Sequence, residues 1–408
     1  MNDRMRNVIF AAPFPLETTM RFAQAAARLD GVRLLGLWQE PPRGDDAGMF
    51  ADIVQVPDAL DTRQLIQGAM RLRERNGPIH RVLGILEPLQ VQLAEVREAL
   101  GVPGASPQTA DLFRDKARMK DELRRHHLPC ARHKVVRTLT DAEEFAEKVG
   151  FPLVVKPPAG MGCKATWRIG NFEELRAALR ALHTSAKNPC IAEEFLRGRE
   201  YSFETITIGG VVRMTSLTRY LPAPLEVMET PWIQWVVVLP RDMHTAEYEG
   251  VHELGVNAVQ ALGLETGMTH MEWFRKDDGT LAIGEIAARP PGAHIVIANG
   301  YAHDIDMYRV WARAVIDDAF DGPFERKYAV GVAFLRGVGR GRVTSVTGVE
   351  EAQKKVGHLV MKAKLPNRGD PRSDSYEGDG YVIVRDPDTD VVKAAVKTII
   401  ETIGIHYA

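Results

Sequence analysis

The sequence predicts a multidomain protein that combines α/β and α+β architecture. Its 408 residues are enough for two to four domains, at about 150 residues per domain. Strand and helix patterns alternate in the first quarter of the chain, whereas residues 323–408 show short strands and a closing amphipathic helix. We therefore expect an α/β domain first and a small α+β domain last.

Residues 1–105 form the first predicted domain. Short apolar runs that suit buried strands alternate there with amphipathic stretches that suit helices. Such alternation is typical of a parallel sheet with crossover helices. The turn-forming stretch Gly-Val-Pro-Gly at 101–104 marks its end. The predicted strands are 8–12, 32–38, 53–56 and 82–86, and the predicted helices are 18–29 and 89–100.

Residues 106–322 form the second predicted domain and residues 323–408 the third. The turn residues Asp321, Gly322 and Pro323 separate them. A strand-rich section at 191–238 lies within the second domain. The third contains a loop at 366–380 and a helix at 391–403. The other predicted elements are helices at 111–127, from 141, 172–183, 248–262 and 306–317, strands at 134–136 and 151–156, and a hairpin centred on 278–279.

The composition excludes several kinds of partner. The 52 Lys and Arg residues nearly balance the 54 Asp and Glu residues, so no global field attracts nucleic acid or an anionic membrane. No apolar run reaches the roughly 18 residues that a membrane span needs. Cys130, Cys163 and Cys190 form no CxxC pair, which argues against a zinc or disulfide framework. We expect a cytoplasmic protein with no nucleic-acid or membrane partner.

The hairpin centred on Asp278 and Gly279 carries the most informative pattern. If these two residues form a type I′ turn, counting outward places Glu272 directly opposite Glu285. Two facing carboxylates repel each other unless a cation lies between them, and carboxylate oxygens suit magnesium. Because side chains alternate along a strand, Arg289 shares a face with Glu285. The alternative is that both glutamates lie on a solvated face.

A loop rich in small residues follows the apolar strand 151–156, which ends in Lys156. Residues 157–166 include Gly160 and Gly162. Small residues let backbone N–H groups approach a phosphate, and the lysine supplies a positive charge. The loop lacks the Walker A pattern. An ordinary turn is the alternative explanation.

Two further segments contain clustered charges. Residues 191–200 read as a strand with two acids that breaks into a turn. Residues 114–137 contain nine basic and three acidic residues, and we expect the basic ones to face an anionic ligand. Taken alone, these segments also fit an edge strand and a solvated charged face.

In order and spacing, the four segments resemble the ATP-grasp superfamily from about residue 105 to 320. The resemblance implies a Rossmann-like pre-ATP-grasp domain at the N-terminus, a two-subdomain ATP-grasp core and a small C-terminal α+β domain. It also implies a role for each matching residue. Lys116 and Lys156 would hold the ATP phosphates, Gly160 and Gly162 would belong to the loop that closes over them, Glu193, Glu194, Phe195 and Leu196 would contact adenine, Glu200 would hold the ribose, Glu272 and Glu285 would bind metal, and Arg289 would be the catalytic arginine.

One position departs from the family pattern. The family usually has Asn two residues after the second metal acid, as a further ligand, and this chain has Ala287. A methyl group cannot coordinate a cation, so the sequence leaves open whether one or two metals bind. The segments 288–294, 336–341, 349–352 and 380–383 further resemble the L-amino acid ligases and biotin carboxylase-like enzymes.

The resemblance implies an ATP-dependent carboxylate–amine ligase that forms an amide through an acyl phosphate and releases ADP and phosphate. Its cofactors would be ATP and Mg²⁺, or Mn²⁺ in its place. Its partners would be a small-molecule carboxylate and an amine, and a homodimer is compatible with the sequence. The aromatic segment 220–235 would shape the amine pocket, although core packing explains it equally well. Two alternatives stay open, namely bicarbonate phosphorylation as in biotin carboxylase and a non-catalytic nucleotide-binding regulator.

Overall fold

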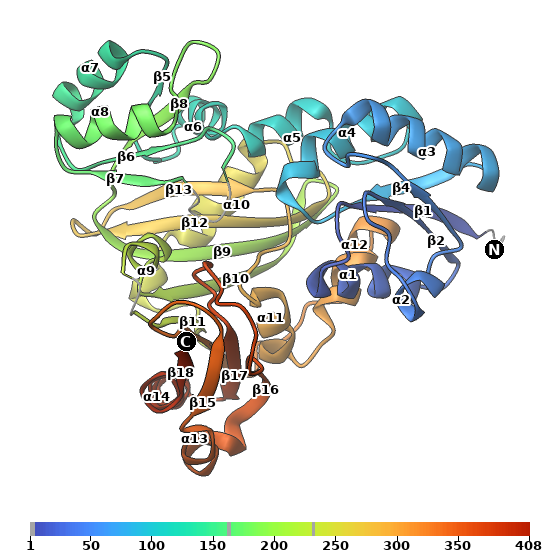
Figure 1. The fold of residues 1–408 in the computed structure, drawn as a ribbon. Helices are drawn as coiled ribbons and strands as arrows, with labels where there is room; N and C mark the ends of the chain where they lie inside the picture. The colour runs from blue at the N-terminus through green and yellow to red at the C-terminus, as the bar shows by residue number, and fades with distance from the viewer. Residues whose placement is uncertain (1–4, 161–164, 231–232) are drawn as a thin grey trace.

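The computed structural model describes residues 5–160, 165–230 and 233–408 (Figure 1). Within these ranges the strands form four sheets, of four, eight, two and four strands. Helices pack on the sheets, so the predicted mixture of α/β and α+β architecture is confirmed. No helix of the described ranges combines the length and the apolar character that crossing a membrane requires.

The N-terminal sheet is parallel, as predicted, with strand order β3-β2-β1-β4. Helix α3 was not predicted, because only four of its residues, at positions 65, 68, 69 and 72, are buried; Asp61 caps its N-terminus. Strand β4 begins and ends three residues earlier than predicted. The elements are β1 (Arg6–Ala12), α1 (Glu17–Ala27), β2 (Val32–Trp38), α2 (Asp45–Gly48), β3 (Asp52–Gln55), α3 (Thr62–Asn76), β4 (Ile79–Leu83), η1 (Glu87–Leu89) and α4 (Gln90–Leu100).

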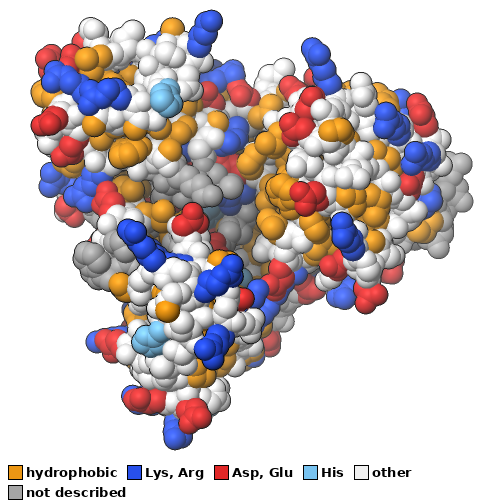
Figure 2. Space-filling view, viewed as in Figure 1, with side chains coloured by type: hydrophobic (Ala, Val, Ile, Leu, Met, Phe, Trp, Pro, Cys, Tyr) orange, Lys and Arg blue, Asp and Glu red, His pale blue; other side chains and the backbone are white. Residues whose placement is uncertain are grey.

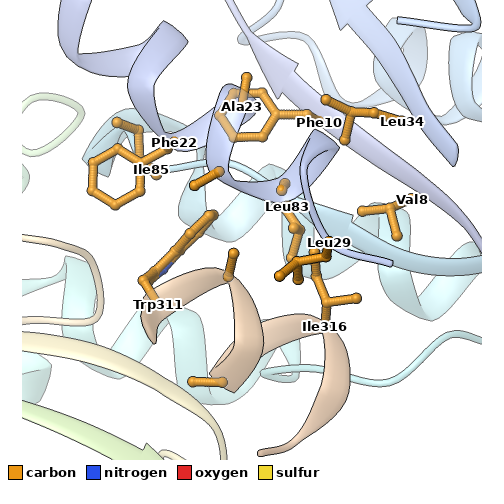
Figure 3. Close-up of a cluster of buried hydrophobic side chains, with 14 of the residues drawn as sticks. Val8, Phe10, Phe22, Ala23, Leu29, Leu34, Leu83, Ile85, Trp311 and Ile316 are labelled. Carbon is orange, nitrogen blue, oxygen red and sulfur yellow. The ribbon is translucent and has the colours of Figure 1, made fainter. Parts of the chain in front are cut away.

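Both faces of this sheet are buried. Alternate residues of β1 point to opposite faces, so that Val8 and Phe10 join one core cluster and Ile9 another, against α3 and α4. The first cluster also contains residues of α12 (Met307–Asp317), a helix from much later in the chain. Figure 3 shows Trp311 of α12 beside Phe22 of α1, and their ring centroids are 4.8 Å apart. The predicted first domain is therefore completed by a helix of the second.

A four-stranded antiparallel sheet, in the order β5-β8-β6-β7, forms the lobe at the top left of Figure 1. Helices α7 and α8 pack on it around a core that includes Leu153 and Ala192. The elements agree with the predicted strands and helices of this region, except that β7 was not predicted. They are β5 (His133–Val136), α7 (Leu139–Val149), β6 (Leu153–Lys156), β7 (Trp167–Ile169), α8 (Phe172–Ala181) and β8 (Cys190–Glu194).

The single helix predicted at 111–127 is wrong. The chain forms two helices there, α5 (Pro107–Arg114) and α6 (Lys116–Arg125), and Asp115 between them has extended backbone angles. The Asp115 carboxylate accepts hydrogen bonds from the backbone N–H groups of Ala117 and Arg118, which caps α6. The break places Lys116 at the first turn of α6.

An eight-stranded antiparallel sheet forms the centre of the molecule, in the order β13-β12-β9-β10-β11-β14-β17-β16. Strand β14 pairs with β11, so the sheet continues from the second predicted domain into the third. Its elements are β9 (Gly198–Ile208), β10 (Val211–Leu221), β11 (Trp235–Leu239), β12 (Gly267–Lys276), β13 (Leu281–Ala287), β14 (Ala329–Leu335), β16 (Val360–Lys364) and β17 (Gly380–Asp386).

Apolar residues on one face of β9, β12 and β13 pack against α6 and α10, and polar residues on the other face remain available for a site. The remaining elements lie around this sheet. They are α9 (Pro224–Glu229), η2 (Ala246–Tyr248), α10 (Val251–Ala261), α11 (Ile295–His303), β15 (Val343–Thr347), α13 (Val349–Val356), η3 (Gly357–Leu359), α14 (Thr389–Thr402) and β18 (Gly404–Tyr407).

The β12–β13 hairpin has the predicted pairing of Glu272 with Glu285 but not the predicted turn. The backbone N–H of Lys276 donates to the carbonyl of Thr280 across a three-residue loop, in which Gly279 has φ +83°. The residue pairs next to the turn are therefore displaced by one residue from the predicted register. A bulge at Gly284, which has no partner in the ladder, then restores the predicted pairing. The longer loop and the bulge each shift the register by one residue in opposite directions, so the carboxylates of Glu272 and Glu285 face each other as predicted.

We predict that Asp115→Ala lowers the thermal unfolding midpoint. Loss of the cap leaves two backbone N–H groups of α6 without their acceptor, at a cost of about 1 kcal/mol. Asp115→Asn keeps a capping oxygen and should retain most of the stability. Equal midpoints for Asp115→Ala and the parent protein in calorimetry would contradict the capping role.

Candidate active site

A cavity of about 370 Å³ lies where the three parts of the chain meet. Figure 2 shows the surface hollowed between the three lobes at this place. Six of the residues predicted from the sequence line the cavity. They are Lys116, Lys156, Gly160, Glu272, Glu285 and Arg289.

The two lysines are held by carboxylates. Lys116 Nζ lies 2.9 Å from Glu285, and Lys156 Nζ lies 2.9 Å from Glu193 and 3.9 Å from Glu285. Burial lowers the pKa of Lys156, but the charges of Glu193 and Glu285 outweigh burial and raise the pKa above its ordinary value. The Lys156 ammonium therefore stays charged, and the two lysines can bind an anionic ligand that enters the cavity.

Glu272 and Glu285 differ in their electrostatic surroundings. Burial raises the pKa of Glu285, but Lys116 and Lys156 outweigh burial and hold this pKa at about 2. Burial and then the charge of Glu285 raise the pKa of Glu272. A divalent cation between the two would relieve their repulsion.

Glu272 and Glu285 fit a magnesium ion whose remaining ligand atoms come from water and from a bound phosphate compound. In the described ranges no group of three or more His, Cys, Asp or Glu side chains is placed to hold a metal. Two facing carboxylates with room for water and phosphate oxygens are nevertheless the usual protein share of a magnesium site. Ala287 also lines the cavity and offers no ligand atom.

Arg289 is anchored by a glutamate that the sequence analysis missed. Glu87 is 3% exposed. Its Oε2 atom accepts a hydrogen bond from Nε of Arg289 at 3.1 Å and lies 3.0 Å from Nη2 of the same arginine. Burial lowers the pKa of Arg289, and Glu87 outweighs this and raises it. The guanidinium is therefore permanently charged and fixed in direction. No motif marks Glu87, and only its position after a buried strand could have suggested it.

Arg114 connects the same glutamate to the glycine-bearing loop. Its guanidinium donates to Glu87 at 3.1 Å, to the Gly160 carbonyl at 3.2 Å and to the Ala159 carbonyl. Lys116 also donates to the Gly160 carbonyl, at 3.0 Å. The start of the loop is thus fixed to the N-terminal part of the chain.

Lys120 belongs to the basic segment 114–137, but the sequence analysis gave it no role of its own. Its side chain is fully buried, lies 2.8 Å from Glu193 and donates to the Gly284 carbonyl at 2.7 Å. Gly284 is the bulge residue and has no partner in the strand ladder, so its carbonyl is available to Lys120. Lys120 follows Lys116 by one helical turn, and that spacing is the signal that could have identified it.

A buried polar network continues the site along the sheet. Glu204 accepts from Ser202 at 2.5 Å and lies 3.0 Å from Nδ1 of His270, whose Nε2 is 3.4 Å from the hydroxyl of Tyr220. His270 and Tyr220 line the cavity. The alternation of polar and aromatic residues along β9 could have predicted that these polar side chains face a site.

Several predicted residues do not line the cavity. Glu194 pairs with Arg132 at 2.6 Å, and the Phe195 ring lies under Arg168. With Glu193, Leu196 and Glu200, they are absent from the cavity lining in the described ranges. Burial and the nearby charge of Glu272 raise the pKa of Glu200, so it lies close to Glu272. Gly162, Cys163 and Trp232 fall outside the described residues.

The expectation that the nine basic residues of 114–137 face an anionic ligand is wrong for most of them. Arg118, Arg124, Arg125, Arg132 and Lys134 pair with neighbouring carboxylates. These five residues form solvated ion pairs, which agrees with the alternative that the segment is a solvated charged face. Lys116 alone of the segment lines the cavity within the described ranges.

Comparison with known proteins supports the predicted family. Residues 121–296 match the ATP-grasp domain family. The chain contains an ATP-grasp domain. The matched stretch includes Lys156, Glu272, Glu285 and Arg289, and Lys116 lies just before it.

Curated relatives match part of the chain. The L-arginine-specific L-amino acid ligase of Bacillus subtilis is 27% identical over 251 residues, which are 60% of this chain and 60% of that protein. The alanine–anticapsin ligase of Bacillus subtilis is 26% identical over 53% of this chain and 49% of its own length. The matches therefore span less than two thirds of these relatives.

Solved structures share the fold over the whole chain. An L-amino acid ligase from Bacillus licheniformis has a TM-score of 0.82 at 21% identity and covers 99% of both chains. N5-carboxyaminoimidazole synthetase from Staphylococcus aureus, solved with ADP, has a TM-score of 0.71 at 17% identity over 97% of this chain and 96% of that one. The ATP-grasp fold is thereby established for this chain.

We predict that Glu193 stabilises the protein at neutral pH and loses this contribution in acid. Burial raises the pKa of Glu193, but Lys120 and Lys156 outweigh burial and hold it at about 2. A depressed carboxyl pKa stabilises the folded state above about pH 4.5, and this stabilisation disappears as the pH falls toward 2. Glu193→Gln should lower the free energy of unfolding by about 3 kcal/mol at pH 7.

Urea titrations at several pH values measure this effect. The difference between the parent protein and Glu193→Gln should shrink between pH 4.5 and 2. Glu194→Gln, which breaks a surface ion pair on the adjacent residue, is the matched control and should change stability by less than about 1 kcal/mol. A pH-independent difference for Glu193→Gln would rule out the proposed electrostatic origin.

Proposed function

We propose that the protein is an ATP-dependent ligase that joins a carboxylate to an amine through an acyl phosphate. The observation that carries this proposal is one cavity that combines two lysines paired with carboxylates, two facing carboxylates and the fixed guanidinium of Arg289. Phosphoryl transfer depends on positioning and charge neutralisation rather than on a protein nucleophile. The ligase names of the relatives support the same reaction class.

Nucleotide binding is assigned to the lysine side of the cavity. Lys116 and Lys156 would exchange their carboxylate partners for the ATP phosphates, and the backbone near Gly160 would approach the phosphates closely. Glu193 to Leu196 would contact adenine through the backbone, and Glu200 would accept from the ribose hydroxyls. The ion pair between Glu193 and Lys156, at 2.9 Å, links the two parts of this site.

Glu272 and Glu285 would hold Mg²⁺, with Mn²⁺ as an alternative. When bound, the metal neutralises phosphate charge and thereby favours phosphoryl transfer. Ala287 contributes no ligand, so a second metal would depend on water and phosphate oxygens. Whether one or two metals bind is a question for metal titration.

The reaction proceeds in two steps. An oxygen of the substrate carboxylate attacks the γ-phosphorus of ATP, the bond to the β–γ bridging oxygen breaks, and ADP leaves. The amine nitrogen then attacks the acyl carbon, gives up a proton, and expels phosphate as the carbon–oxygen bond breaks. Arg289 would bind the acyl phosphate and the oxyanion, because a fixed cationic donor suits the charge that develops there.

The substrates would be small molecules that bind beside the nucleotide. Tyr220, Met228 and Trp235 line this part of the cavity and would form its apolar wall. The cytoplasmic location and the homodimer remain predictions. A biotin carboxylase domain with the same fold is described as a dimer, at 17% identity and a TM-score of 0.69.

An ADP-release screen of the purified protein tests the proposed function. Carboxylic acids and amines are offered singly and in pairs with Mg²⁺ and ATP, and mass spectrometry identifies any amide. ADP formation that requires an organic acid supports the ligase. ADP formation with bicarbonate alone would favour the biotin carboxylase-like alternative, and tight ATP binding without turnover across the panel would favour the regulatory one.

We predict that Glu285→Ala lowers the rate of ADP release by about 100-fold or more, because one of two metal carboxylates and the partner of Lys116 are lost. The assay is carried out at saturating ATP and Mg²⁺. Glu253→Ala, an exposed position on α10, is the control and should keep the parent rate. Near-normal turnover of Glu285→Ala would refute the metal assignment.

We predict that Lys156→Ala weakens ATP binding by about tenfold or more, since it removes a charge-assisted contact to phosphate. Calorimetry measures the dissociation constant in the absence of an acid substrate. Lys148→Ala, at the exposed end of α7, serves as the control. Unchanged affinity in Lys156→Ala would show that this lysine does not contact the phosphates.

A further inference from the structure

A second cavity, of about 340 Å³, lies between the N-terminal lobe, α12 and the turn that precedes β12. Arg289 and Pro290 line both this cavity and the first one, so the two cavities share a wall. In the described ranges none of the lysines and glutamates assigned to the nucleotide and the metal lines the second cavity. The reaction proposed above makes no use of it.

Much of the lining of the second cavity is apolar. Leu83 of β4 and Trp311 of α12 line it, and Figure 3 shows both in the buried cluster between these elements. Leu264 and Met268, just before and at the start of β12, line it as well. The apolar part of a ligand would be removed from water against these side chains.

Three arginines line the second cavity, and two of them are paired with carboxylates. Arg81 lies 2.6 Å from Asp318, and Arg289 lies 3.0 Å from Glu87. Arg97 differs, because no carboxylate of the described residues lies within ion-pair distance of it, and burial lowers its pKa to about 10 without an opposing charge. Arg97 is half-buried and still charged at neutral pH. An anionic ligand would supply the missing counter-charge.

The guanidinium of Arg97 is held in a fixed direction. Its Nε atom donates to the carbonyl of Val82 at 2.9 Å. Its stem passes over Gly104, where an added Cβ would lie 2.6 Å from Cδ, so a larger residue at 104 would displace it. Among the described residues the two Nη atoms have no hydrogen-bond partner. Paired N–H groups of this kind suit a carboxylate or a phosphate.

The acids of the lining do not cancel this charge. Asp318 is already paired with Arg81, and Glu265 is exposed, so solvent screens its charge. The position of Arg97 in the last turn of α4 suits the helix dipole, but a dipole supplies only part of a counter-charge. Arg97 is therefore the charge of this lining, within the described ranges, that a ligand would compensate.

We propose that the second cavity binds a small organic anion, whose carboxylate or phosphate group is held by Arg97 and whose apolar part packs against Trp311 and Met268. An apolar lining with one fixed polar group that sets the orientation is the usual form of a small-molecule site. This site is separate from the nucleotide and metal site, and its existence does not depend on the proposed ligase function.

Calorimetry with matched probes tests the site. Benzoate, phenyl phosphate and inorganic phosphate are the anions, and benzamide is the uncharged analogue of benzoate. Each titration contains a non-hydrolysable ATP analogue and Mg²⁺, so that the nucleotide part of the first cavity is occupied. The proteins are the parent, Arg97→Met, Arg97→Lys, Asp318→Asn and the control Arg71→Met, at an exposed position of α3.

The parent protein should bind benzoate or phenyl phosphate about tenfold or more tightly than benzamide, and Arg97→Met should lose that advantage. Arg97→Lys should keep part of it, because the charge remains without the planar fork. Asp318→Asn releases Arg81 and should tighten anion binding about threefold. Asparagine tolerates the φ of +50° at position 318, so this variant should keep the fold. Arg71→Met should behave as the parent.

The same titrations distinguish the two anionic groups. Tighter binding of phenyl phosphate than of benzoate would identify the ligand as a phosphate ester, and the reverse order would identify it as a carboxylate. Equal binding of inorganic phosphate and phenyl phosphate would overturn the proposal, because the apolar part of the ligand would then contribute nothing.

Other results would also overturn the proposal. They are equal anion affinity of the parent and Arg97→Met, equal binding of benzoate and benzamide, and the absence of saturable binding for every probe. Crystals soaked with 4-iodobenzoate locate the ligand independently. The anomalous signal of iodine beside Trp311 would support the site, and a signal confined to the first cavity would refute it.

Discussion

The site depends on an alternating row of buried charges. Lys116, Glu285, Lys156, Glu193 and Lys120 follow one another with separations of 2.9, 3.9, 2.9 and 2.8 Å between ammonium nitrogens and carboxylate oxygens. The row joins α6, β13, β6 and β8, which belong to three regions of the chain. Each charge is tolerated because its neighbours have the opposite sign, so removal of one leaves the next uncompensated. The charges of Glu193 and Glu285 keep Lys156 charged and in position for an anionic ligand.

A second set of ion pairs connects the N-terminal lobe to this row. Glu87 accepts from Arg114 and Arg289, and Arg114 also contacts the carbonyls at the start of the glycine-bearing loop. The lobe also shares its core with α12. These contacts position the arginine that would receive the acyl phosphate. The N-terminal part of the chain therefore contributes to the geometry of the site as well as to the fold.

The β12–β13 hairpin illustrates how far a sequence pattern can determine a site. The pairing of Glu272 with Glu285 was predicted from an assumed two-residue turn, and the pairing is correct although the turn has three residues. The bulge at Gly284 compensates the difference and also directs a carbonyl to Lys120. A glycine within a strand can signal a bulge, but its presence alone does not fix where the register shifts. The helix predicted at 111–127 failed for a similar reason, since Asp115 is compatible with a helix interior until its capping contacts are known.

The sequence by itself predicted the parallel N-terminal sheet, most strands and helices, and five charged residues of the cavity lining, namely Lys116, Lys156, Glu272, Glu285 and Arg289. Local periodicity predicted the elements, and the resemblance of short motifs to the ATP-grasp superfamily predicted the residues, because both depend on neighbours along the chain. Only the tertiary structure decided which charges meet. Glu87 and Lys120 carry no motif, and each acquires its surroundings from residues between about 70 and 200 positions away. Ion pairing and burial depend on distances across the fold, and a linear pattern does not specify them.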